Sequence, residues 1–169
     1  HNFKRGVAAF SYSQGMKKSM YAFKYNNRRE YAKYYASVIA KEFKDVIFSW
    51  NCEVLVPVPL HRSKLIKRGY NQAEILAKRL SEQLLIPMDN KILIRTRNTA
   101  PLKELNEKER ITNLKRAFQT DEIKLKYKRI ILVDDIYTTG STIDECAWTL
   151  LRNGAEEVYF ITACIGRGF

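Results

Sequence analysis

Two adjacent acids, Asp134 and Asp135, directly follow an apolar, β-branched run that ends at Val133. Small residues come next, and most of them carry a hydroxyl group: Thr138, Thr139, Gly140, Ser141 and Thr142. Ionised carboxylates only accept hydrogen bonds, so they suit a pair of sugar hydroxyls or a hydrated cation. Hydroxyls and free backbone N–H groups at the start of a helix suit a phosphate. Together, these groups fit a ribose 5-phosphate.

These residues need a strand before them and a helix after them. The run from Ile130 to Val133 is typical of a buried strand, and Ser141 to Asn153 is predicted to be a helix that Gly154 closes. Such a strand places the acids at the carboxyl edge of a sheet, where open α/β folds bind ligands. A strand, a turn and a capped helix with solvated acids would give the same pattern. The sequence has no Gly-x-x-x-x-Gly-Lys, Gly-x-Gly-x-x-Gly or Gly-x-Ser-x-Gly motif, which favours the ribose 5-phosphate interpretation.

Strands and helices alternate along the rest of the chain. Helical periodicity covers residues 16–48, with a break near Asn26 and Asn27. The core-facing stripe of this region is expected to be Tyr31, Tyr34, Tyr35, Val38, Ile39 and Phe43. The other expected elements are strands over 54–58, 92–94 and 157–164 and a helix over 71–84. This alternation predicts an α/β fold with a mainly parallel sheet flanked by helices, in a single domain over 1–169.

The stretch from Arg95 to Arg116 differs from its surroundings. It is polar and charged, contains Pro101 and shows little periodicity. We expect a mobile loop followed by a short helix, which closes over a bound ligand.

The net charge of +12 is concentrated in the N-terminal part of the chain. Residues 1–68 contain fourteen Lys and Arg but only four acids. Tyrosines and phenylalanines are interleaved with the cations Lys17, Lys18, Arg28 and Arg29. Single-stranded nucleic acid is held in this way, by cations that follow phosphates and aromatic rings that stack on bases. A solvated helix face, an acidic protein partner, or tyrosines that pack the helices onto the sheet would also explain the pattern.

The three cysteines, Cys52, Cys146 and Cys164, form no Cys-x-x-Cys pair. An odd number of cysteines, without an apolar signal-peptide core near the N-terminus, predicts reduced thiols in a cytoplasm. Neither His1 nor His61 stands at a zinc-ligand spacing from them, so no zinc site is expected. The apolar runs are too short to cross a membrane, and no membrane insertion is expected.

The segment from Ile130 to Thr142 resembles the motif with which type I phosphoribosyltransferases bind 5-phosphoribosyl-1-pyrophosphate (PRPP). The stretches Val56-Pro57-Val58-Pro59-Leu60 and Lys67-Arg68-Gly69-Tyr70-Asn71-Gln72 resemble the ComF (GntX-like) branch, which is linked to natural competence and DNA uptake. Further likeness, such as Phe23-Lys24-Tyr25, extends over almost the whole chain. Members of that branch commonly carry an N-terminal cysteine-rich zinc ribbon, which this sequence lacks, and often have Gln where Leu102 stands.

The resemblance implies that different residues of the site bind different parts of PRPP. Asp134 and Asp135 would bind the ribose hydroxyls, and Thr138 to Thr142 would bind the 5-phosphate. Mg²⁺ would enter with PRPP near the acid pair, without a dedicated set of protein ligands. The pyrophosphate would face the loop after the first strand, which is formed by Pro59, Leu60, His61 and Arg62. Lys67 and Arg68 follow this loop and, with Arg62, would supply positive charge.

Two functions of different classes follow from the resemblance. The first is a PRPP-binding protein of DNA uptake, with single-stranded DNA and other competence proteins as partners. The alternative is a true phosphoribosyltransferase of nucleotide metabolism, acting on an unidentified acceptor. A 6-oxopurine acceptor is disfavoured, because transferases of that class carry an acid where this chain has Thr138, and no catalytic residue stands out.

Overall fold

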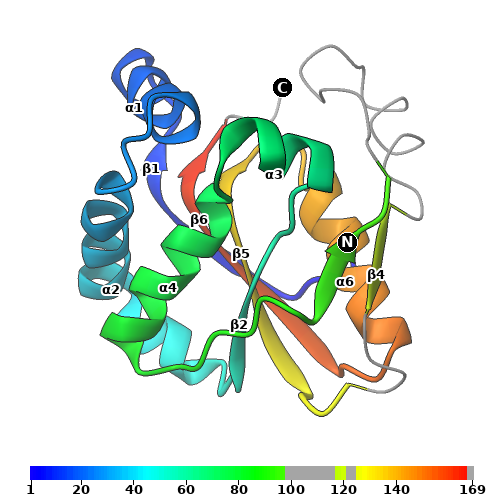
Figure 1. The fold of residues 1–169 in the computed structure, drawn as a ribbon. Coiled ribbons are helices and arrows are strands. Elements are labelled where there is room, and N and C mark those ends of the chain that lie inside the picture. Colours follow the sequence, from blue (N-terminus) through cyan, green and yellow to red (C-terminus); the bar gives the residue numbers. More distant parts are fainter. Residues whose placement is uncertain (98–116, 121–124, 167–169) are drawn as a thin grey trace.

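The computed structural model describes residues 1–97, 117–120 and 125–166. Its centre is a four-stranded parallel sheet with the strand order β1-β6-β5-β2 (Figure 1). The strands are β1 (Gly6–Ser11), β2 (Val54–Pro57), β5 (Arg129–Tyr137) and β6 (Glu157–Ile165). Two short strands, β3 (Leu93–Arg95) and β4 (Phe118–Thr120), form a separate antiparallel pair.

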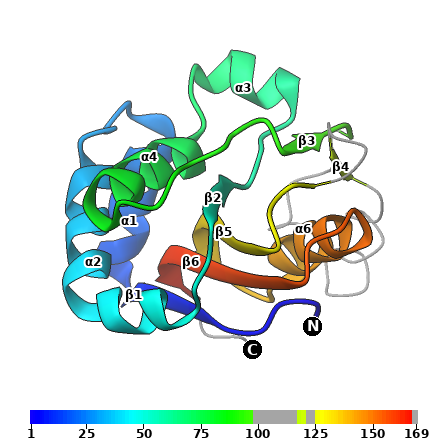
Figure 2. The same cartoon turned by 90° about the horizontal axis from the view of Figure 1, so that it is seen from below.

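Helices cover both faces of the parallel sheet. Figures 1 and 2 place α1, α2 and α4 on one face and α6 on the other. These helices are α1 (Gln14–Tyr25), α2 (Tyr31–Ser49), α4 (Gln72–Leu84) and α6 (Ser141–Arg152). A fifth helix, α3 (Arg62–Arg68), follows β2 and lies over the carboxyl ends of the strands (Figure 1). The α/β fold with a parallel sheet flanked by helices is confirmed.

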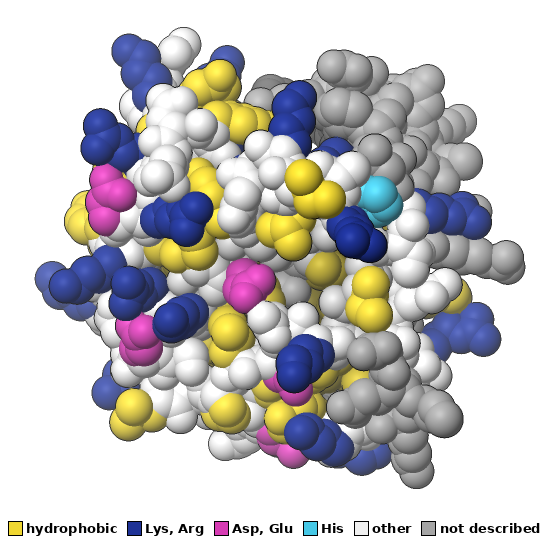
Figure 3. Space-filling model, viewed as in Figure 1, with side chains coloured by type: hydrophobic (Ala, Val, Ile, Leu, Met, Phe, Trp, Pro, Cys, Tyr) yellow, Lys and Arg dark blue, Asp and Glu magenta, His cyan; other side chains and the backbone are white. Residues whose placement is uncertain are grey.

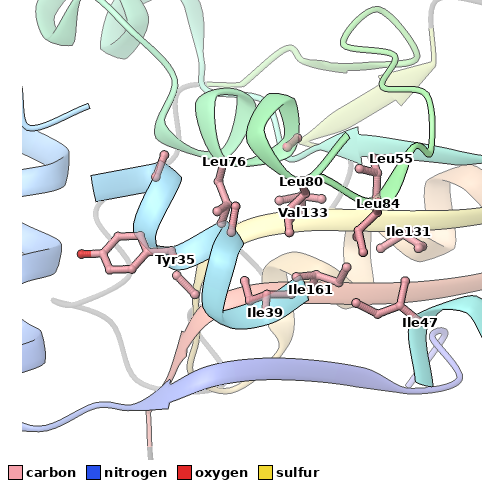
Figure 4. Close-up of a cluster of buried hydrophobic side chains, with 14 of the residues drawn as sticks. Tyr35, Ile39, Ile47, Leu55, Leu76, Leu80, Leu84, Ile131, Val133 and Ile161 are labelled. Atoms are coloured by element: carbon pink, nitrogen blue, oxygen red, sulfur yellow. The ribbon is translucent and has the colours of Figure 1, made fainter. Parts of the chain in front are cut away.

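Strand β5 supplies both halves of the hydrophobic core because its side chains alternate between the two faces of the sheet. Ile131 and Val133 pack with α2 and α4 in one cluster, whose side chains converge in Figure 4. Ile130 and Leu132 pack with α6 and the β3–β4 pair in the other. All four side chains are fully buried. The strand is therefore packed on both faces up to Asp134 and Asp135, which lie within it.

Most of the predicted elements are present. The helical region is interrupted after α1, where Asn27 takes a positive φ of 56°, and Gly154, with φ 110°, follows α6. The predicted stripe on α2 is confirmed at Tyr35 and Ile39, which are buried, and wrong at Tyr34, which is 62% exposed. Tyr34 lies next to Tyr35 on the helix and stacks on Phe10 at the surface instead, with 6.0 Å between ring centroids.

Three short elements were not predicted: β1, α3 and β4. Helix α3 has no buried residue, so it carries no apolar periodicity that the sequence could show. The predicted loop and helix from Arg95 to Arg116 lie, from residue 98 onward, outside the described residues.

Replacing Leu80 by Ala tests the packing of α4 on the sheet. Leu80 is fully buried in the cluster shown in Figure 4, so truncation should lower the free energy of unfolding by about 2–5 kcal/mol. Leu85→Ala is the matched control, because Leu85 directly follows the same helix and is 87% exposed. Urea unfolding measures both, and equal losses in the two variants would contradict the packing.

Candidate functional site

Consecutive positions on β5 send the two acids to opposite sides of the sheet. Asp134 lines a small hollow together with the loop that follows the strand and the first residues of α6, residues 136–143. Asp135 instead lies under α1 and α4, on the side of Ile131 and Val133, and is only 4% exposed. The sequence predicted one site for the acid pair, and the structure places the pair astride the end of the strand.

The Asp135 carboxylate is surrounded by donors from the protein. Lys24 Nζ of α1 lies 2.6 Å from its Oδ2, and Gln72 Nε2 of α4 donates to the same oxygen over 3.1 Å. The backbone N–H of Ile136 donates to Oδ1 over 2.8 Å. Burial lowers the pKa of Lys24, but the nearby carboxylates of Asp135 and Asp134 outweigh it and leave that pKa raised. Lys24 and Asp135 therefore form an ion pair that is largely shielded from solvent.

Fewer protein groups offset the desolvation of Asp134. It accepts a hydrogen bond from the backbone N–H of Asp135, 2.8 Å from its Oδ1. Burial, followed by the charge of Asp135, raises the pKa of Asp134 to about 8. Burial thus disfavours the charged form of Asp134. Such a group gains most from a ligand that brings positive charge or hydroxyl donors.

The loop after β5 opens helix α6 without a side-chain cap. Gly140 stands at the N-cap with φ 79°, a left-handed conformation that favours glycine. A Cβ at this position would also lie 2.5 Å from the Tyr137 hydroxyl. Thr139 and Ser141 share a hydrogen bond between their hydroxyls, 2.8 Å long. The first N–H groups of a helix have no partner within the helix, so this loop offers N–H and O–H donors to an anion.

The predicted pyrophosphate loop is built around α3. His61 is the N-cap of this helix: its Nδ1 accepts from Ser63 N, 3.3 Å away, which gives the histidine a structural role. Pro59 and Leu60 are partly buried, whereas Arg62 and Lys67 point to solvent. Arg68 is partly buried, bonds to Gln72 Oε1 and lies over the Tyr25 ring, 5.0 Å from its centroid. Of the predicted cations, Arg68 is therefore the one tied to the acid pair.

Two further cations stand near this site, and the sequence analysis did not single them out. Burial, then the charges of Arg95 and Arg68, lower the pKa of Lys64. Burial lowers the pKa of Arg95, and the nearby Cys146 and Asp134 oppose that shift. Lys64 is thus within electrostatic reach of Arg95 and Arg68, and Arg95 is within reach of Asp134. Like charges held together at a site are typical of a surface that binds an anion.

The Tyr70-Asn71-Gln72 segment holds the helices around these cations. The Tyr70 hydroxyl donates to the backbone carbonyl of Phe23 over 2.6 Å, joining α1 to the start of α4. Asn71 caps α4 by accepting from Ala73 N, and its Nδ2 donates to the Val58 carbonyl over 3.0 Å. The motif that carried the family resemblance therefore connects α1, β2 and α4 at the edge that bears the acids.

The cations predicted to bind nucleic acid touch this network at Arg29, whose guanidinium lies over the Tyr70 ring, 4.4 Å from its centroid. Lys17, Lys18, Arg28 and Arg29 are all exposed, on α1 and on the turn after it. Two exposed tyrosines of α1, Tyr21 and Tyr25, lie beside each other with ring centroids 4.9 Å apart. Figure 3 shows Lys and Arg side chains spread over the described part of one face, where they outnumber the acids.

Within the described ranges, no three His, Cys, Asp or Glu side chains are grouped so as to hold a metal ion. No helix in those ranges is both long enough and apolar enough to cross a membrane.

The fold and this site define a class of protein. Residues 65–168 match the family described as the Phosphoribosyl transferase domain, and the chain belongs to that family. A crystal structure of a purine phosphoribosyltransferase from Pyrococcus horikoshii is similar, with a TM-score of 0.48 and 19% identity over 78% of this chain and 74% of that one.

Proteins with similar sequences place this chain in a particular branch of that family. DNA utilization protein YhgH of Escherichia coli K12 is 32% identical over 165 residues, which are 96% of this chain and 72% of YhgH. Competence protein F of Haemophilus influenzae is 42% identical over 108 residues, 63% of this chain and 47% of that protein. Competence protein ComFC of Bacillus subtilis is 32% identical over 89% of this chain and 60% of its own length. The matched region therefore spans about half of competence protein F, and the resemblance to the ComF branch is confirmed.

The raised pKa of Asp134 predicts a specific pH dependence of stability. Between about pH 4 and pH 8 the folded chain keeps a proton on Asp134 that the unfolded chain releases, so the free energy of unfolding should fall as the pH rises. Asp134→Asn removes the titration, and its stability should fall less over the same range. Urea unfolding at about pH 5 and pH 8.5 measures the difference. Parallel profiles of parent and variant would show that Asp134 titrates normally.

Proposed function

We propose that this chain binds PRPP with Mg²⁺ at the carboxyl end of β5, as a PRPP-binding protein of DNA uptake. The observation that carries the proposal is that Asp134 and the start of α6 line one hollow. The cations support it, because the charge of Arg95 acts on Asp134 and the charges of Arg95 and Arg68 act on Lys64. A diol, a phosphate and a pyrophosphate need acceptors, N–H donors and cations, respectively. PRPP carries all three groups.

The 5-phosphate is assigned to the loop from Thr138 to Thr142. Its hydroxyls and the first N–H groups of α6 are donors, and the positive end of the helix dipole favours an anion there. The ribose hydroxyls are assigned to the acid pair, of which Asp134 lines the same hollow as the loop. The phosphate and the ribose of one ligand thus meet adjacent residues.

The pyrophosphate is assigned to the α3 side of the site. Arg68, Lys64 and Arg95 supply positive charge, and the predicted Pro59–Arg62 loop leads into the same helix. Magnesium fits this arrangement, because Mg²⁺ in proteins is usually bound through one or two carboxylates and the phosphates of a ligand. Asp134 is the carboxylate best placed to hold it, and the ion would neutralise pyrophosphate charge when bound.

Phosphoribosyl transfer is the alternative use of the same site. In that reaction the bond from ribosyl C1 to the pyrophosphate oxygen breaks, and an acceptor atom bonds to C1. Arg68, Lys64 and Arg95 would stabilise the departing pyrophosphate. Our proposal puts binding first, because the relatives are named for competence and DNA utilization. The three free thiols fit a reducing cytoplasm.

Single-stranded DNA is the second ligand that we propose. The four exposed cations, Lys17, Lys18, Arg28 and Arg29, flank the Tyr21 and Tyr25 rings, and bases can stack on exposed aromatic rings. Two other aromatic residues of the basic segment, Phe23 and Tyr35, are buried and belong to the core. The names of the relatives support the idea of a DNA-handling role, which other competence proteins would share as partners.

Calorimetry with PRPP and Mg²⁺ tests the first proposal. The parent should bind, and Asp134→Ala should weaken binding roughly 10- to 100-fold, the value of one or two charge-assisted hydrogen bonds. Asp45→Ala, which removes an exposed acid of α2, should bind as the parent does. If the parent fails to bind PRPP, the proposal is wrong. A screen for pyrophosphate release with candidate acceptors then separates binding from transfer.

Salt dependence tests the DNA proposal. Each phosphate contact adds about 0.7 to the log–log slope of affinity against salt on single strands, so changing Lys17, Lys18, Arg28 and Arg29 together to Gln should lower the slope by roughly three. The matched control replaces four exposed cations elsewhere on α2 and α4: Lys41, Lys44, Lys78 and Arg79. The control carries the same change in net charge and should keep the slope. Equal slopes in both quadruple variants would move the DNA site elsewhere.

A further inference from the structure

The two adjacent acids have different surroundings, and that difference separates their roles. Asp135 accepts three hydrogen bonds or ion-pair contacts from the protein, from Ile136 N, Lys24 Nζ and Gln72 Nε2. With only 4% of its surface exposed, it has little room for a ligand. Asp134, by contrast, accepts one backbone hydrogen bond and lines the hollow beside the phosphate loop.

Gln72 connects Asp135 to Arg68 through hydrogen bonds at the two ends of its carboxamide. A carboxamide has one donating end and one accepting end. The ionised carboxylate of Asp135 can only accept, so it holds the Nε2 end of Gln72. The Oε1 end must then face the other way, where Arg68 Nη1 donates to it. Reversing the carboxamide would set an oxygen against the carboxylate and a nitrogen against the guanidinium.

Arg68 is fixed by this contact and by one ring. Its guanidinium lies 5.0 Å from the centroid of the Tyr25 ring, which is carried by α1, the helix that also carries Lys24. An arginine side chain loses much rotational freedom when it is held in one orientation. Orienting it in advance lowers the cost of binding an anion.

We infer that Asp135 is a positioning residue, which orients Arg68 toward the pyrophosphate through Gln72, while Asp134 alone meets the ribose. This inference rests on the proposed PRPP site and departs from the assignment of both acids to the ribose hydroxyls.

Two ligands that differ only in the pyrophosphate separate the alternatives. Ribose 5-phosphate has the phosphate and the sugar hydroxyls of PRPP but nothing for Arg68 to bind. If Asp135 positions Arg68, Asp135→Asn should weaken PRPP about tenfold and change ribose 5-phosphate by less than about twofold. Asp134→Asn should weaken both ligands. Calorimetry with each ligand in the presence of Mg²⁺ gives the two ratios.

Gln72→Leu provides a second route to the same answer. Removing Asp135 deprives the buried Lys24 of its partner, whereas Gln72→Leu removes the connection without stranding a charge. It should reproduce the selective loss of PRPP binding. Gln83→Leu, on the exposed side of the same helix, is the control for the substitution and should leave both ligands unchanged. If Asp135→Asn does not fold, as judged by its thermal melt, Gln72→Leu decides the question alone.

Two outcomes overturn the inference while leaving the proposed function intact. One is an equal loss of both ligands in Asp135→Asn, which would mean that this acid contacts the ribose directly. The other is unchanged PRPP affinity in Gln72→Leu. A parent chain that binds neither ligand would instead overturn the proposed function, and this inference with it.

Discussion

Strand β5 carries two carboxylates into the end of a buried sheet in consecutive positions, and a strand turns consecutive side chains to opposite faces. Each carboxylate is therefore desolvated in a different environment and needs its own compensating partners. On one face the partner is Lys24 of α1, whose Nζ lies 2.6 Å from Asp135 Oδ2. On the other face, the described residues give Asp134 one backbone hydrogen bond, and its pKa rises to about 8. The candidate site therefore lies at Asp134, the acid whose desolvation the protein offsets less.

The same constraint explains the arrangement of the helices at this edge. Lys24 can reach Asp135 only if α1 lies over the end of β5, and Tyr70 joins α1 to the start of α4 through the Phe23 carbonyl. Gln72 then completes the donors of Asp135 and turns its oxygen toward Arg68. Contacts between α1, α3, α4 and β5 thus converge on one carboxylate, although these elements are far apart in the sequence.

Local patterns were enough to predict the fold class and the core of the candidate site. The apolar run that ends at Val133, the acids and the start of α6 at Ser141 are neighbours in the chain, so their spacing shows the strand, the loop and the helix. The partners of that segment were not predictable in this way. Lys24 stood out only within the Phe23-Lys24-Tyr25 likeness to the family, because no local pattern shows whether a lysine points inward or outward. Lys64 and Arg95 likewise join the site only through folding.

One further part of the site was available in the sequence and was overlooked. Residues two apart on a strand share a face, so Asp135 falls on the face of Ile131 and Val133. Asp134 falls on the face of Ile130 and Leu132. Strand alternation therefore already assigns the two acids to different faces. A buried ion pair is weak evidence for stability, because the cost of desolvating two charges can exceed their attraction. Apolar side chains of similar size could fill the space of Lys24 and Asp135 without that cost. What apolar side chains could not do is hold one end of Gln72 and so direct the other toward Arg68. The physical advantage of the pair therefore lies in orientation.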